Sequence, residues 1–153
     1  MIHYRNHVSR SGVNGRALVA TARRVLAAAG EEGVGLSLTL VGDRAIRKLN
    51  REYRGKDGPT DVLSFPLEPE GPGGASQPER LLGDVVISVE TARRQAAEYD
   101  APLQREIYRL LIHGVLHLMG HDHQEADERH AMRLAERRLA DAIALPWPYA
   151  RIR

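Results

Sequence analysis

The feature that most constrains the fold of this chain is a histidine-rich segment, His113-Gly-Val-Leu-His-Leu-Met-Gly-His-Asp-His123. His113 and His117 are four residues apart, so an α-helix would place both imidazoles on one face, about one turn apart. Gly120 can adopt the left-handed conformation that ends a helix, which would let the chain fold back and return His123 to the same point. The segment therefore predicts a helix, a sharp stop and a returning loop that bring three imidazoles together.

Three converging imidazoles are typical of a transition-metal site. Three protein ligands leave the fourth position of a tetrahedral ion open for water or substrate, whereas a structural zinc site is usually closed by four. We therefore predict a catalytic site with one zinc ion on His113, His117 and His123, although imidazole also serves nickel, copper and iron. His121 is the alternative third ligand. Asp122 could either orient a ligand imidazole or cap the next helix.

The histidine spacing equals that of the metzincin protease motif HExxHxxGxxH, including its glycine. Gly114, however, stands where those proteases carry the glutamate that acts as general base. We therefore expect no peptidase activity. Because a glycine inside a helix costs about 1 kcal/mol relative to alanine, Gly114 reflects either neutral drift or a geometric requirement, and we favour the close approach of a strand or a substrate at this point.

The hydropathy pattern of the whole chain predicts an α+β fold, with a small mixed sheet of about four strands packed with about five helices in one domain, residues 1–153. The histidine-bearing helix falls in the C-terminal half. Strands are expected at Ile2–Asn6, Leu36–Val41, Val62–Phe65 and Gly83–Ser88, and helices at 15–29, at 43–54, from about 90, at 102–119 and at 125–143.

Local signals set the ends of these elements. Asp43 and Ser88 are expected to cap the second and third helices, and Tyr53 continues the apolar helical spacing of the second. Residues 68–80 are rich in proline and glycine, and we assign them no regular structure.

Composition narrows the functional classes. The chain has no cysteine, which excludes disulfides, thiolate metal sites and cysteine nucleophiles. No apolar stretch is long enough to cross a membrane and no apolar leader opens the chain, so a soluble, cytoplasmic protein is expected. Twenty of the 22 basic residues are arginine, the side chain best suited to paired contacts with phosphate. This composition permits a nucleic-acid partner.

With the histidine segment, four further segments resemble the YbeY-type endoribonucleases, a family of bacterial rRNA maturation factors. They are Leu49–Arg54 (LNREYR), Thr60–Phe65 (TDVLSF), Leu82–Ser88 (LGDVVIS) and the pair Arg105-Glu106. The resemblance implies a metal-dependent, single-strand-specific endoribonuclease that acts in 16S rRNA 3′-end maturation and ribosome quality control. It implies single-stranded RNA, rRNA and the small ribosomal subunit as partners, a zinc-like ion on the three histidines, and a functional arginine at Arg54.

The residues by themselves leave several roles open. Arg54 could clamp a phosphate beside the turn at 55–59, or it could be a helix-end cation favoured by the helix dipole. Asp61, Ser64 and Asp84 border apolar strands and are expected to form structural hydrogen bonds, although one of them could stand behind a metal ligand. Two other functions stay open at this point: a non-catalytic ribosome assembly factor with an organising metal, and, less favoured, a metallopeptidase.

Overall fold

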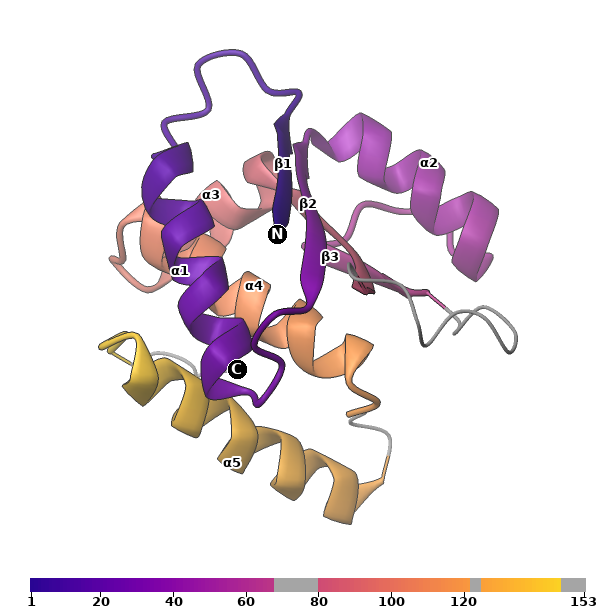
Figure 1. The fold of residues 1–153 in the computed structure, drawn as a ribbon. Coiled ribbons are helices and arrows are strands. Elements are labelled where there is room, and N and C mark those ends of the chain that lie inside the picture. Colours follow the sequence, from indigo (N-terminus) through magenta and orange to yellow (C-terminus); the bar gives the residue numbers. More distant parts are fainter. Residues whose placement is uncertain (68–79, 122–124, 147–153) are drawn as a thin grey trace.

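A computed structural model describes residues 1–67, 80–121 and 125–146, in which four strands form one mixed sheet and five helices pack around it (Figure 1). The elements are β1 (Ile2–Asn6), α1 (Gly15–Ala28), β2 (Gly35–Val41), α2 (Asp43–Arg54), β3 (Val62–Pro66), β4 (Leu81–Ser88), α3 (Val89–Glu98), α4 (Leu103–Leu118) and α5 (Ala126–Ala142). The predicted α+β class and the predicted order of elements are confirmed. None of the helices in the described ranges is long and apolar enough to span a membrane.

The strand order across the sheet is β1-β2-β4-β3. β1, β2 and β4 are parallel, whereas β3 pairs with β4 in the antiparallel direction, as expected for two strands joined by a single connecting loop. β3 is therefore an edge strand, with a sheet neighbour on one side only in the described ranges.

The two faces of the sheet are covered unequally (Figure 1). The larger core joins one face to α1, α3 and α4, and α5 packs against α1 and α4. On the other face, a small cluster joins the sheet to α2 alone. That small cluster consists of Val41, Ile46, Leu63 and Val86, with Leu49 and Phe65 packed against it.

The capping prediction for α2 is wrong, whereas that for α3 is confirmed. Gly42 is the N-cap of α2, and the first N–H, that of Asp43, donates to Glu90 Oε1 at 2.8 Å. The Asp43 carboxylate does not cap α2 but accepts hydrogen bonds from Ser88 Oγ at the end of β4 and Thr91 Oγ1 in α3, at 2.7 and 2.6 Å. Ser88 caps α3 by accepting from the Thr91 N–H.

Candidate functional site

A cleft of about 680 Å³ opens at the outer edge of β3, between the C-terminal ends of α2 and α4. We call it the histidine cleft. α2 contributes Asn50 and Arg54 to its lining, and α4 contributes His113 and His117. β3 runs beside α4, so Arg54 at the end of α2 and the two histidines of α4 line the same cleft.

His113 and His117 turn their Nε2 atoms towards each other, 3.1 Å apart, with ring centroids separated by 4.6 Å. Two nitrogen ligands of a tetrahedral zinc ion, each about 2.0–2.1 Å from the metal, would lie about 3.3 Å apart. The donor type and the spacing of the two rings thus fit two ligands of one metal ion. The helical i, i+4 arrangement inferred from the sequence produces this convergence.

The segment after α4 begins as predicted. Gly120 has a φ of +96°, in the left-handed region that favours glycine, and it lets the chain leave the helix. His121 follows it and lines the histidine cleft. His123 and Asp122 lie outside the described residues, and within the described ranges no group of three His, Asp or Glu side chains is placed to hold a metal ion.

Glu136 on α5 is a neighbour of the site that the sequence did not reveal. Its Oε2 lies 4.0 Å from His113 Nδ1, and both side chains are largely shielded from solvent. A proton on Nδ1 would face this carboxylate and leave Nε2 of His113 available as a donor to a metal. Glu136 therefore places a carboxylate in front of Nδ1 of His113, at a distance longer than a hydrogen bond.

Arg54 is the last residue of α2, and Gly55 ends the helix in the left-handed conformation, with a φ of +68°. The turn beyond it is fixed by Asn50, whose buried side chain donates to the Gly58 carbonyl at 2.9 Å. Lys56 in this turn also lines the histidine cleft. Neither Asn50 nor Lys56 was singled out from the sequence. Together with Arg54, Lys56 places two cations beside the two imidazoles.

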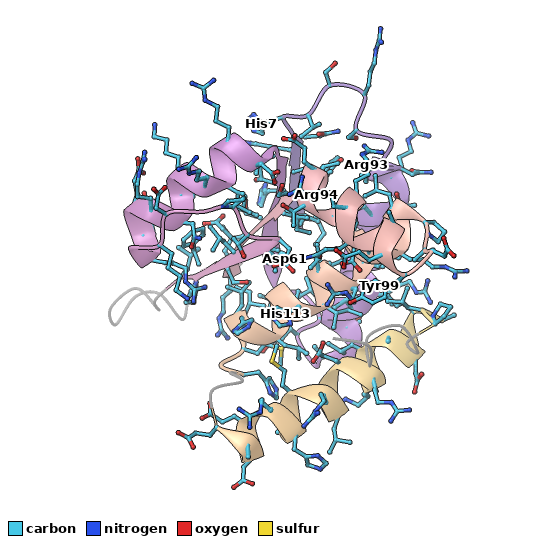
Figure 2. The ribbon with its side chains drawn as sticks, turned by 180° about the vertical axis from the view of Figure 1, so that it is seen from behind. His7, Asp61, Arg93, Arg94, Tyr99 and His113 are labelled. Carbon is cyan, nitrogen blue, oxygen red and sulfur yellow. The ribbon has the colours of Figure 1, made fainter. Side chains whose placement is uncertain are left out.

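Asp61 lines the same cleft and lies close to His113 in Figure 2. Its carboxylate accepts hydrogen bonds from the Val62 N–H at 2.8 Å and from Gln95 Nε2 at 3.3 Å. Its Oδ2 also lies 3.9 Å from Nη2 of Arg109. The structural hydrogen bonding expected for Asp61 is confirmed, and it connects the cleft to the interior of the protein.

Behind Asp61, α4 carries an ion pair inside the core. Arg109 donates from Nε and Nη2 to the two carboxylate oxygens of Glu106, at 2.8 and 2.7 Å. Glu106 is fully buried and Arg109 is only 5% exposed. Charges three residues apart on a helix are usually solvated, so nothing in their spacing predicted this burial.

α4 packs tightly against the sheet at Gly114. A Cβ atom added there would lie 2.8 Å from Val85 Cγ1 and 3.2 Å from Ser64 Oγ, and Ser64 Oγ donates to the Gly114 carbonyl at 3.0 Å. The predicted close approach of a strand is confirmed. The strand side chains leave little room for a side chain at Gly114, the position of the metzincin glutamate. Asp84, by contrast, lines a cleft with residues of the α2-covered face, on the other side of the sheet.

Comparisons with known proteins agree with this architecture. The family model described as Endoribonuclease YbeY matches residues 3–144. Endoribonuclease YbeY of Moorella thermoacetica is 54% identical over 121 residues, covering 73% of this chain and 78% of the relative, and that of Pelotomaculum thermopropionicum is 48% identical over 129 residues, covering 84% and 85%. The solution structure of TM1509 from Thermotoga maritima shares the fold, with a TM-score of 0.57 and 22% identity over 94% of this chain and 92% of that one. The chain belongs to the endoribonuclease YbeY family.

Proposed function

We propose that this protein is a metal-dependent endoribonuclease that cuts single-stranded RNA during 16S rRNA 3′-end maturation and ribosome quality control. Its substrate is then rRNA in the small ribosomal subunit, and its place of action is the cytoplasm. The observation that carries the proposal is the convergence of His113 Nε2 and His117 Nε2 in a cleft that also holds Arg54 and Lys56. The two imidazoles suit a metal ion, and the two cations beside them suit the negative charge of a phosphodiester.

For the metal we propose His113, His117 and His123 as ligands of one zinc ion, with nickel or another transition metal as a possible occupant of the same donor set. His121 lines the cleft and is the competing third ligand. When bound, the ion would supply Lewis-acid activation of water and of a phosphate oxygen. Glu136 contributes by orienting His113, because its carboxylate faces Nδ1.

Arg54 has the proposed role of binding the scissile phosphate. Its planar guanidinium can donate two parallel hydrogen bonds to phosphate oxygens and stabilise the negative charge that grows on them in the transition state. Lys56, in the turn after α2, adds a point charge to the same cleft. Among the described residues Arg54 forms no salt bridge, so a phosphate would not have to displace a carboxylate partner there.

The test compares zinc-loaded wild-type protein with His117→Ala on an end-labelled single-stranded RNA and on the same RNA in a duplex. We expect internal cuts in the single strand, little cutting of the duplex, and loss of both cleavage and zinc binding in His117→Ala. Circular dichroism checks that the variant is folded. Cleavage by a folded His117→Ala variant at the wild-type rate would contradict the proposal.

The third ligand is tested separately by zinc titration of His123→Ala and His121→Ala. Removing a true ligand should weaken zinc affinity strongly, because it leaves only two protein donors. We expect this loss in His123→Ala. The opposite result, with loss confined to His121→Ala, would reassign the third ligand.

A further inference from the structure

A second cleft, also of about 680 Å³, lies on the sheet face that α2 only partly covers. We call it the sheet-face cleft. Its floor is built by outward-facing side chains of the strands, and its wall by Leu49 and Tyr53 of α2. One row of floor residues runs across all four strands in register. That row is His3, Ser37, Asp84 and Phe65.

The end of α2 separates this cleft from the histidine cleft. Successive residues of an α-helix are rotated by about 100°, so Tyr53 faces the sheet-face cleft while its neighbour Arg54 lines the histidine cleft. β3 shows the same division, because Ser64 lines the histidine cleft and Phe65 the sheet-face cleft. A strand of nucleic acid that leaves the histidine cleft around the C-terminal end of α2 therefore meets Tyr53 next.

The Tyr53 side chain is exposed to solvent and is therefore accessible to a ligand. Its helical spacing with Ile46 and Leu49 suggested a core position, yet the structure leaves it 67% exposed. The ring meets Phe65 edge to face, with centroids 5.4 Å apart and an interplanar angle of 66°. This contact orients the ring while most of it stays accessible, as a stacking platform for a nucleobase requires.

The positive charge of α2 favours a negatively charged partner. The helix has five basic residues and two acidic ones, a net charge of +3, whereas the whole chain has a net charge of only +2. The basic residues are Arg44, Arg47, Lys48, Arg51 and Arg54, and the acidic ones Asp43 and Glu52. The sheet-face cleft itself holds, among the described residues, one cation, Arg5, and one carboxylate, Asp84. An exposed aromatic ring on a basic helix complements a polyanion with accessible bases.

We propose that single-stranded RNA runs from the histidine cleft around the end of α2 into the sheet-face cleft, where Tyr53 stacks on a base flanking the cleaved bond and Arg5 contacts the backbone. The proposal rests on the proposed function of the histidine cleft and extends it. It makes Tyr53 a binding residue for the flanking part of the substrate, remote from the reacting phosphate.

The first test measures KM and kcat of Tyr53→Ala on two single-stranded RNAs. For a substrate of about ten nucleotides, KM should rise about fivefold or more, the loss expected for one aromatic stacking contact, whereas a substrate of about three nucleotides should show no change. Tyr53→Phe should retain the wild-type KM because it keeps the ring. The matched control is Leu134→Ala, an exposed apolar residue on α5 that lines neither cleft.

The second test locates the base directly, by photocrosslinking RNA that carries 5-iodouridine on either side of the cleavage point. A crosslink mapped to Tyr53 or Phe65 by mass spectrometry is the expected result. Crosslinks confined to the histidine cleft, or an unchanged KM of Tyr53→Ala on the longer RNA, would overturn this path alone. If wild-type protein cleaves no RNA, the proposed function fails, and a crosslink to Tyr53 would still report the binding path.

Discussion

α4 and α2 approach the histidine cleft from two sides, and they hold their functional residues by different means. Ten of the sixteen residues of α4 are buried, whereas only Ile46 and Asn50 are buried among the twelve of α2. The histidines are therefore fixed by core packing on α4, while Arg54 stands at the exposed end of α2. A metal site needs donors held at defined distances, and a phosphate contact can adjust to its ligand. The difference predicts that changes on α4 cost stability and changes on α2 cost activity.

The largest stability loss is expected from Arg109→Ala on α4. The variant leaves the fully buried Glu106 carboxylate without its main cationic partner, which typically destabilises a protein by about 3–5 kcal/mol. Urea unfolding measures the change, and Arg133→Ala, an exposed arginine on α5, should stay within about 0.5 kcal/mol of wild type. A loss below about 1 kcal/mol in Arg109→Ala would show that α4 does not depend on this pair.

The next largest effect should come from Arg54→Glu on α2, and it should appear in activity alone. Removing a donor that stabilises transition-state charge typically lowers the rate about 10²- to 10³-fold, equivalent to about 2.7–4 kcal/mol. Thermal stability and zinc content should stay close to wild type, because Arg54 is exposed.

Arg51→Glu provides the control for Arg54→Glu, since it makes the same charge change on the same helix at an exposed residue that lines neither cleft. Equal losses of cleavage in the two variants would mean that only the net charge of α2 matters. Unfolding or zinc loss in Arg54→Glu would mean that α2, like α4, has a structural role at the site.

Overpacking a tight core usually costs about 1–3 kcal/mol, and alanine regains about 1 kcal/mol of helix propensity over glycine, so Gly114→Ala should destabilise the protein by up to about 2 kcal/mol. The added Cβ would lie 2.8 Å from a γ-carbon of Val85, a short branched side chain that cannot swing aside, so α4 and the sheet must separate slightly. Gly58→Ala is the matched control, because nothing lies within 4 Å of a Cβ added there. Equal stability of the two variants would contradict tight packing at Gly114, and we expect no peptidase activity from either.

The smallest effect concerns Asp43, which ties α2 to the start of α3. Partial burial alone would raise the pKa of the Asp43 carboxyl, but hydrogen bonds from Ser88, Thr91 and Arg94 and the charge of Arg94 hold the pKa below its ordinary value. A carboxyl with a lowered pKa in the folded state stabilises the fold above its ordinary pKa, and this contribution is lost as the pH falls through the lowered value.

Unfolding free energies of wild type and Asp43→Asn between neutral pH and about pH 3 test this linkage. Wild type should be the more stable protein at neutral pH, and the difference should shrink at the acid end as Asp43 takes up its proton. A difference that does not vary with pH would indicate that the hydrogen bonds, and not the charge, hold α2 in place.

The sequence predicted what depends on neighbouring residues. Alternating apolar residues located the strands, and the i, i+4 spacing of His113 and His117 implied their convergence. Predictions from the sequence failed where contacts between residues far apart in the chain decide the position of a side chain. Asp43 accepts hydrogen bonds from Ser88 at the end of β4 and from Thr91 in α3, and Glu136 lies near His113 only because α5 packs on α4. Tyr53 stays exposed because α2 covers only part of its sheet face, a property of the assembled sheet and not of the helix.

The ion pair inside α4 also bears on how this chain can evolve. A substitution of either Glu106 or Arg109 alone strands a charge in the core, whereas replacing both by apolar residues of similar volume is often neutral or stabilising. A lineage that carries the pair is thus separated from an apolar alternative by intermediates that fold poorly. We expect the two residues to be inherited together or replaced together, irrespective of how much the pair itself adds to stability.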